Sequence, residues 1–161
     1  MTNKTINLLI IDDDKADVEL FSAWIRDPMS GYQFNVYKAY SAAAGYMALE
    51  EEDIHCIVVD YKMAGDTGLD FIKTISNTHK ECPVILSTAF PDELLELESI
   101  EQGAQFFFRK SDLNKDTFRH QILEAVELHQ SNLLTSYHTA QKMLVRLKYE
   151  HNLHGEAETV T

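Results

Sequence analysis

Four apolar stretches of this chain each end on a polar residue, and together these residues suit phosphoryl chemistry. LLII leads into a carboxylate triplet, CIVV into one carboxylate, VILS into a hydroxyl and FFFR into an ammonium: Asp12 to Asp14, Asp60, Thr88 and Lys110. If the stretches are parallel strands of one sheet, their carboxyl ends meet at one edge, where open α/β folds bind ligands. We therefore expect the four groups to share one site.

The carboxylates predict a divalent cation. Two unit charges about 4 Å apart repel by about 4 kcal/mol at an effective dielectric of about 20, so Asp12, Asp13 and Asp60 need a cation if they converge. Mg²⁺ suits them, because it prefers hard oxygen ligands and keeps several waters. A carboxylate beside Mg²⁺ and Lys110 can attack a phosphoryl group, since both cations offset charge on the transferring oxygens. The product would be an aspartyl phosphate.

The threonine gives this chemistry a second state. The hydroxyl of Thr88, at the end of a neighbouring strand, can donate a hydrogen bond to a phosphoryl oxygen on Asp60. Its position would then differ before and after phosphorylation. We therefore expect the site to act as a switch.

The elements that must position these residues follow an alternating pattern. Short β-branched stretches alternate with helical patterns, which is typical of repeated βαβ units and a parallel sheet. We predict an α/β domain with strands at 7–11, 33–39, 56–60, 84–88 and 105–108. The helices between them are predicted at 16–26, from the N-cap Ser41 to about Glu51, at 68–79, and from Pro91 as the first helical residue.

The C-terminal part has one long helical pattern. Residues 116–151 contain neither Gly nor Pro, and apolar residues recur at helical spacing. A continuous helix of that length would extend roughly 50 Å at about 1.5 Å per residue, so it must project, break or fold back. The candidate breaks are at 131–132 and 135–136. Three interpretations stay open: a connector to another module, an extra helix packed on the domain, or a dimerising coiled coil. The seven-residue spacing of Val126, Leu133, Ala140 and Leu147 slightly favours the coiled coil, although His129 and Ser136 occupy intervening seam positions. Residues 151–161 are expected to be a frayed tail.

Composition limits the classes of function. With 161 residues and 45% apolar content the chain can bury one core, and its net charge of −12 argues against direct nucleic-acid contact. Cys56 and Cys82 lack metal-ligand spacing and are expected to be reduced. No apolar window suits a signal peptide or a membrane span. We expect a cytoplasmic protein without membrane contact, whose partners are proteins.

These residues resemble the receiver domain of two-component response regulators. The stretch VVDYKMAGDTGLDFI is similar to the family's loop pattern VxDxxMPxxxGxxxI, and the resemblance covers about 5–129. It implies a doubly wound, flavodoxin-like sheet of five parallel strands in the order 2-1-3-4-5. The chain would then divide into a receiver domain at 1–129 and a helical extension and tail at 130–161.

The resemblance also implies a role for each acidic residue. Asp60 would accept the phosphoryl group from a sensor histidine kinase or a phosphotransfer protein. Asp12 and Asp13 would bind Mg²⁺ together with Asp60 and the backbone carbonyl of Lys62. The chain would catalyse only its own phosphorylation and dephosphorylation, so we do not expect an enzyme that acts on other substrates.

The same resemblance predicts how the signal leaves the site. Thr88 and Lys110 would stabilise the phosphoryl group, and Phe107 would swing inward when Thr88 moves. Strand alternation places Phe107 on the opposite face from Phe106 and Phe108. The face at 91–129 would then meet a downstream protein target or a second copy of the chain.

Departures from the family pattern bear on rate. Ala64 stands where Pro is usual, so the loop after Asp60 should be less rigid. Ser111 stands where Pro often follows the lysine, so a cis peptide is not expected there. Lys62 and Phe90 each lie two residues beyond a site residue and should border the phosphate. We expect Phe90 to hinder the hydrolytic water and slow self-dephosphorylation.

Other classes of protein share parts of this pattern. An Asp triplet after a strand can be a helix N-cap with dipole-favoured acids. Aspartyl-nucleophile phosphatases have a DxD pattern, but in this chain Lys62 occupies the position of the second acid. A flavin-binding protein of this fold would need a Gly- or Ser-rich loop after the first strand, where this chain has acids. A pseudo-receiver would act as a docking scaffold without phosphorylation.

Overall fold

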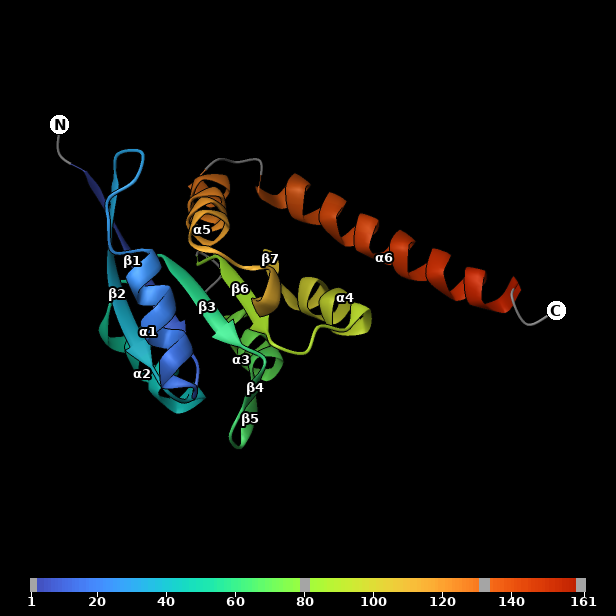
Figure 1. The fold of residues 1–161 in the computed structure, drawn as a ribbon, viewed down its shortest axis with the longest axis horizontal. Coiled ribbons are helices and arrows are strands. Elements are labelled where there is room, and N and C mark those ends of the chain that lie inside the picture. Colours follow the sequence, from blue (N-terminus) through green and yellow to red (C-terminus); the bar gives the residue numbers. More distant parts are fainter. Residues whose placement is uncertain (1–2, 79–81, 131–133, 159–161) are drawn as a thin grey trace.

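A five-stranded parallel sheet forms the centre of the computed structural model, which describes residues 3–78, 82–130 and 134–158 (Figure 1). The strands lie in the order β2-β1-β3-β6-β7. Their bounds are β1 Lys4–Ile11, β2 Tyr32–Ala39, β3 Cys56–Asp60, β6 Val84–Thr88 and β7 Phe106–Arg109. Counted along the chain, this is the order 2-1-3-4-5, so the predicted doubly wound fold is confirmed.

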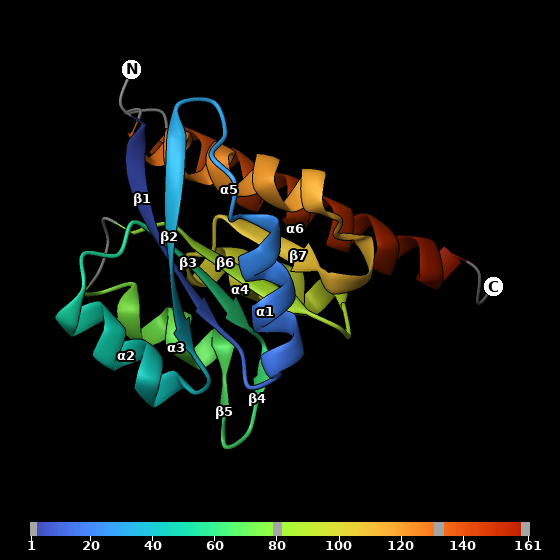
Figure 2. The ribbon, with the colours of Figure 1, turned by 60° about the vertical axis from the view of Figure 1, so that its left-hand side comes forward.

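Helices cover both faces of the sheet (Figures 1 and 2). Alternation along β1 sends Ile6, Leu8 and Ile10 to one core and Leu9 and Ile11 to the other. The first core packs against α1 (Lys15–Trp24) and α5 (Lys115–Gln130). The second packs against α2 (Ala42–Glu51), α3 (Gly68–Ile75) and α4 (Glu93–Gln102).

The loop predicted after Asp60 contains a short antiparallel hairpin. Its strands are β4 Lys62–Met63 and β5 Asp66–Thr67, and Gly65 turns between them with a φ of 78°. Gly68 then opens α3 where any side chain would collide with the backbone oxygen of Asp60. The glycine lets α3 begin directly against the end of β3, which keeps the hairpin beside the carboxyl edge of the sheet.

Three predicted helix ends are wrong. The first helix ends at Trp24, two residues before the predicted end at 26. Asp92, rather than the residue before Pro91, is the N-cap of α4: its side chain accepts a hydrogen bond from the amide of Leu94 at 2.9 Å, and the helix begins at Glu93. A carboxylate cap satisfies a helix amide directly, which outweighs the preference of Pro for the first turn. The third helix ends at Ile75, short of the predicted His79, which itself lies outside the described residues.

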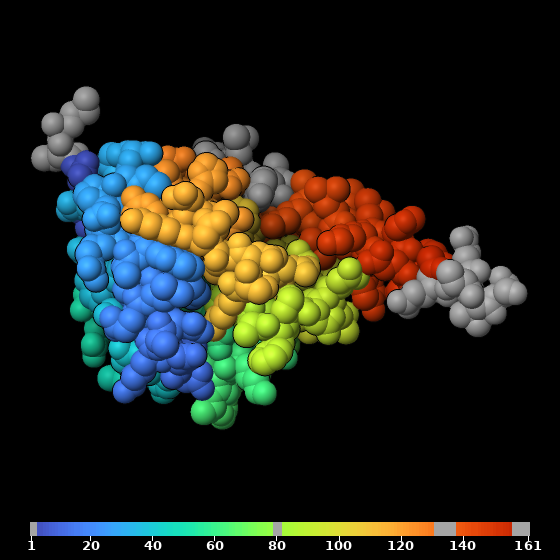
Figure 3. Space-filling view, in the orientation of Figure 1, coloured from blue at the N-terminus to red at the C-terminus, as the bar shows by residue number. Residues whose placement is uncertain are grey.

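The C-terminal pattern forms two helices, not one. α5 ends at Gln130 and α6 spans Leu134–Glu158. The candidate break at 131–132 falls outside the described residues, and the candidate at 135–136 is wrong because both residues lie within α6. α6 folds back beside α4, so the chain contains the extra packed helix, and its last turns extend past the domain (Figures 1 and 3). Residues 151–158 are helical, which corrects the predicted frayed tail. No helix among the described residues is long and apolar enough to cross a membrane.

Contacts at seven-residue intervals hold α6 on α4. His138 Nε2 lies 3.1 Å from the carbonyl oxygen of Ile100, Val145 packs on the α4-side core, and Asn152 donates to Glu93 at 2.7 Å. Arg146 adds an ion pair with Glu101. A seven-residue repeat returns to the same side of a helix after two turns, so these contacts define one continuous face of α6.

Candidate functional site

The carboxyl ends of β1, β3, β6 and β7 border a cavity of about 190 Å³. It includes every residue predicted for the site except Phe107. The lining residues are Asp12, Asp13, Asp14, Asp17, Asp60, Lys62, Thr88, Ala89, Phe90 and Lys110. The four apolar stretches thus bring their terminal polar groups together, as the sheet topology requires.

Three carboxylates in this cavity are close enough to share one cation. Asp12, Asp13 and Asp60 each offer an oxygen, and these oxygens all lie within 4.8 Å of one another. Opposite ligands of one Mg²⁺ are about 4.2 Å apart, because each stands about 2.1 Å from the ion. Carboxylate oxygens are ligands that Mg²⁺ prefers, so the donor set fits this ion, and the bound on the separation of the oxygens is close to that distance. Lys62 lines the cavity, and the role of its backbone carbonyl as a further ligand stays a prediction.

Lys110 joins the acids through three ion pairs. Its Nζ lies 2.7 Å from Asp12 Oδ2, 2.9 Å from Asp60 Oδ1 and 2.8 Å from Asp17 Oδ2. Burial opposes the charge of this ammonium, but the hydrogen bonds to the carboxylates, that to Asp12 first, raise the pKa of Lys110 above its usual value. The lysine therefore stays charged beside the proposed phospho-acceptor.

Burial makes the two inner carboxylates reluctant to ionise without a cation. The pKa of Asp60 is raised to about 6, mainly by burial; the hydrogen bond from Lys110 opposes the rise and the charge of Asp12 adds to it. Burial also raises the pKa of Asp12, against the hydrogen bond from Lys110. A divalent cation would reverse this balance by favouring both charged forms.

Thr88 lies at the end of β6 with its hydroxyl in the cavity wall. Its Oγ1 accepts a hydrogen bond from the amide of Phe90 at 3.1 Å, which leaves the hydroxyl proton to be donated. The ring of Phe90 is 76% exposed at the rim of the cavity. Both residues line the same cavity as Asp60, and their effects on a phosphoryl group stay predictions.

Phe107 does not line this cavity. It lies on β7 between the buried Phe106 and Phe108, half-buried against the core on the α4 side, while its two neighbours belong to the opposite core. The predicted alternation of the three rings is thus confirmed. Phe107 borders a separate cavity of about 180 Å³ with Leu113 and Thr117, and its swinging motion stays a prediction.

The Asp triplet divides between two tasks. Asp14 is the N-cap of α1, since its side chain accepts the amide of Ala16 at 2.9 Å, while Asp12 and Asp13 belong to the acidic cluster. The N-cap alternative is therefore correct for one member of the triplet. Asp17, in the first turn of the same helix, is a cavity residue that the sequence reasoning missed; its position three residues after a capping Asp was the available signal.

The residue at position 64 contacts the site through its backbone. The amide of Ala64 donates a hydrogen bond to Asp13 Oδ2 at 2.9 Å. Proline has no amide hydrogen, so the usual family residue could not make this contact. The substitution that predicted a looser loop thus also allows the hairpin to be attached to an acidic-cluster residue.

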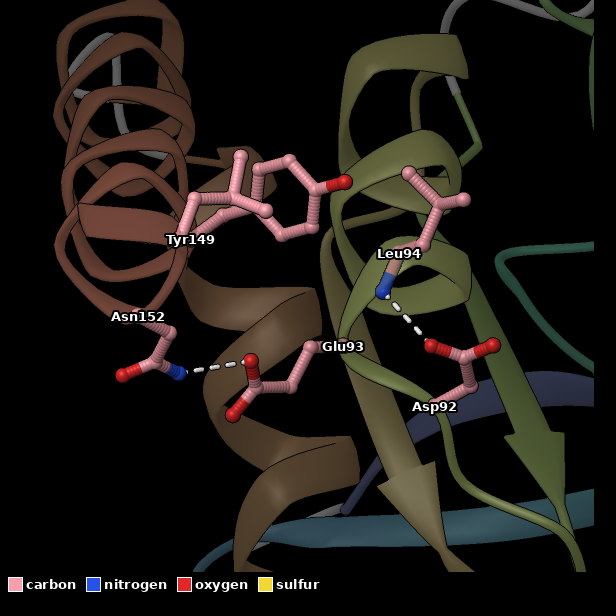
Figure 4. Close-up of a pocket in the computed structure, with 6 residues that line it drawn as sticks. Asp92, Glu93, Leu94, Tyr149 and Asn152 are labelled. Carbon is pink, nitrogen blue, oxygen red and sulfur yellow. Dashed lines mark hydrogen bonds between the residues drawn. The ribbon is translucent and has the colours of Figure 1, made fainter. Parts of the chain in front are cut away.

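A third cavity, of about 220 Å³, lies between the start of α4 and the second half of α6 (Figure 4). Tyr149 extends from α6 toward α4, Leu94 also lines the cavity, and Asn152 donates to Glu93. Asp92 is engaged as the cap of α4. Because these polar groups already pair within the chain, we interpret this cavity as part of the helix–helix contact.

The fold and the site together define a doubly wound α/β protein with an acidic cavity at the carboxyl edge of its sheet. The chain belongs to the response regulator receiver domain family, whose model matches residues 8–126. The matched segment contains the whole acidic cluster, Thr88, Phe107 and Lys110. It ends within α5 and does not include α6.

Curated relatives are similar over the same part of the chain. The transcriptional regulatory protein ZraR of Salmonella typhimurium is 27% identical over 104 residues, 65% of this chain and 23% of that protein. A cyclic di-GMP phosphodiesterase of Thermotoga maritima is 28% identical over 122 residues, 75% of this chain and 31% of that protein. The two-component response regulator ORR3 of Oryza sativa subsp. indica is 27% identical, over 74% of this chain and 94% of that protein. The chain thus spans about a quarter of the first relatives and nearly all of the last.

Solved structures share the fold. A CheY-like receiver domain protein from Methanospirillum hungatei matches with a TM-score of 0.69 at 20% identity and covers 79% of this chain and 98% of its own. NtrX from Brucella abortus, solved in complex with ADP, matches with a TM-score of 0.71 at 20% identity, over 82% of this chain and 29% of its own. At these identities the likeness concerns the fold alone.

Proposed function

We propose that this chain is a phosphorylation-dependent switch of a two-component or phosphorelay system, with Asp60 as the phospho-acceptor. The carrying observation is the placement of Asp60, which shares the acidic cluster with Asp12 and Asp13 and lies 2.9 Å from the ammonium of Lys110. Mg²⁺ bound by these carboxylates and the Lys62 carbonyl would supply positive charge for the transferring phosphoryl oxygens. The proposed donor is a histidine kinase or a phosphotransfer protein.

The chain's own residues supply the other parts of the transfer. A carboxylate oxygen of Asp60 forms the new P–O bond as the P–N bond of a donor phosphohistidine breaks. The imidazole leaves as a neutral ring because its other ring nitrogen already carries a proton. Lys110 offsets charge on the phosphoryl oxygens in a loose transition state. Thr88 can then donate its hydroxyl to a phosphoryl oxygen, which gives the switch its second state.

The cavity residues weigh against turnover as a phosphatase. Such an enzyme needs a second acid to move a proton, and Lys62 stands where that acid is expected. The two remaining acids of the cavity are engaged, because Asp14 caps α1 and Asp17 pairs with Lys110. We therefore propose that the chain acts only on its own phosphoryl group and passes its signal through protein contacts in the cytoplasm, without direct nucleic-acid or membrane contact.

Intact mass tests this proposal. The chain is incubated with acetyl phosphate with and without Mg²⁺, and the wild type is compared with Asp60→Asn and with Asp66→Asn, a neighbouring acid outside the cavity. We expect one phosphoryl adduct that needs Mg²⁺ and Asp60 but not Asp66. No adduct on the wild type would favour the docking scaffold, and free phosphate released over many turnovers would favour the phosphatase.

A further inference from the structure

Asp17 is a third carboxylate on Lys110 that the proposed phosphoryl chemistry does not use. Its Oδ2 lies 2.8 Å from Lys110 Nζ, as close as the oxygens of Asp12 and Asp60 at 2.7 and 2.9 Å. It is the most exposed of the three acids, with 30% of its side chain accessible, and it lies outside the acidic cluster. A cation bound to the cluster would therefore leave Asp17 as a partner for the lysine.

The other two partners of Lys110 have a competing task. Asp12 and Asp60 both belong to the acidic cluster, so a bound cation would draw their oxygens toward itself, and a phosphoryl group would cap one oxygen of Asp60. Lysine is a compact charge on a flexible four-carbon stem, and fixing such a side chain loses considerable rotamer freedom. A partner that keeps its charge throughout would hold the ammonium in place during transfer.

Asp17 is well placed to be that partner because its element is rigid. It lies in the first turn of α1, which Asp14 caps, and negative charge is favoured at a helix N-terminus. The neighbouring Val18 and Phe21 are buried in the core between the sheet and α5. Lys110, in contrast, opens a 3₁₀ turn of three residues, Lys110–Asp112, after the sheet has ended. The helix side of the ion pair is thus the better anchored one.

We propose that Asp17 is a positioning residue that holds the ammonium of Lys110 beside Asp60 when the cation and the phosphoryl group occupy the other carboxylates. The inference rests on the proposed phosphorylation of Asp60. Asp17 does not touch the transferring group and acts through Lys110. Its removal leaves the site intact but lets the lysine sample orientations that do not meet the phosphoryl oxygens.

The test measures the rate of adduct formation at saturating Mg²⁺ over a series of acetyl phosphate concentrations. We expect Asp17→Asn to lower the maximal rate by about tenfold, which corresponds to about 1.4 kcal/mol in activation free energy, and Asp17→Glu to restore part of it. Glu19→Gln is the matched control, because Glu19 lies on the same helix and pairs with Lys38 away from the cavity. Its rate should equal that of the wild type.

The Lys110→Met background separates positioning from other effects. If Asp17 acts through the lysine, Asp17→Asn will be silent in that background. The same cycle in denaturant, without Mg²⁺, gives a readout independent of phosphoryl transfer: the unfolding midpoints should show coupling between positions 17 and 110 and none between 19 and 110.

These measurements distinguish a failure of the positioning role from a failure of the proposed function. A wild-type maximal rate in Asp17→Asn, or an equal loss in the Lys110→Met background, would overturn the positioning role and leave the proposed function standing. A change only in the Mg²⁺ concentration that gives half the maximal rate would also overturn it, since Asp17 would then act as a distant charge on the cation. Failure of the wild type to form an adduct would overturn the proposed function and this inference together.

Discussion

The ionised carboxylate of Asp60 lowers the stability of the folded state when no cation is bound. Asp60 is buried among like charges, and its pKa is raised to about 6 because burial disfavours the carboxylate. The folded state therefore binds a proton more tightly than the unfolded chain does. The charged form lowers stability above pH 6, and this penalty disappears as the pH falls to the unfolded value of 3.8.

Asp60→Asn should therefore stabilise the protein in the absence of divalent cations. At pH 8 in a chelator we expect the free energy of unfolding to rise by on the order of 1–3 kcal/mol, from the size of the pKa shift. The gain should shrink as the pH is lowered toward 5. Chemical denaturation at several pH values measures it, with Asp66→Asn as the control. A loss of stability at pH 8 would contradict the argument.

The exposed ring of Phe90 predicts a long-lived phosphoryl group. The ring borders the cavity next to Thr88, where it can hinder the water that attacks the aspartyl phosphate. We expect Phe90→Ala to shorten the half-life of the adduct several-fold, about the range of a modest barrier change of 1 kcal/mol. Decay of the adduct mass after removal of the donor measures this. Leu94→Ala, an exposed residue of α4 outside the cavity, is the control. An unchanged half-life in Phe90→Ala would remove the shielding role.

At the scale of helices and strands, the sequence predicts correctly those boundaries that are determined by residues close to them in the chain. The strand Cys56–Asp60 is predicted to the residue, because a buried apolar run ends on a charge. The start of α4 is predicted wrongly, because Pro91 and Asp92 both carry N-terminal signals and only hydrogen-bond geometry decides between them. A local signal places Asp17 in the first turn of α1, but its ion pair with Lys110 joins this helix to the end of β7, and that pairing between distant segments has no local signal.

The docking of α6 is equally hidden in the sequence. The residues of α6 that contact the domain include His138, Val145 and Asn152, and this mixture of polar and apolar residues does not form a hydrophobic pattern. Leu144 and Leu147, in contrast, are 67% and 55% exposed. From hydropathy alone, both leucines would be expected to face the domain. The structure turns them to solvent because His138 and Asn152 find polar partners on α4.

Val145 and Leu144 form a matched pair for testing this docking. Val145→Ala removes packing on the core, and we expect amide hydrogen exchange in residues 134–158 to accelerate about fivefold, corresponding to about 1 kcal/mol, with little change in the sheet. Leu144→Ala should leave exchange nearly unchanged. Hydrogen-exchange mass spectrometry makes the comparison. Equal effects of the two substitutions would contradict the observed orientation of α6.

At the scale of the whole molecule, the exposed side of α6 supports a second copy of the chain as a partner. Ala140, Leu144 and Leu147 recur at the four- and three-residue spacing of a coiled-coil seam, and all three are exposed. We propose that two copies pair through this side of α6. The division of the chain into two parts at 129–130 also stays a prediction.

Leu147→Lys should then weaken self-association. Sedimentation velocity over a range of concentrations is expected to show a dimer for the wild type and a monomer for the variant, because a buried lysine at a seam position opposes pairing. Leu20→Lys, an exposed leucine of α1, is the control. A monomeric wild type at high concentration, with and without phosphorylation, would remove the dimer from consideration.

The attachment of α6 to α4 also sets a threshold for any other protein that uses the outer surface of α4. Because α6 is joined to the same chain, it is a tethered competitor, present at an effective concentration on the order of millimolar however dilute the protein is. A partner binds only in the fraction of time that α6 is away, and its apparent affinity falls by that fraction. The docked α6 therefore keeps proteins of low affinity from binding to this surface of α4.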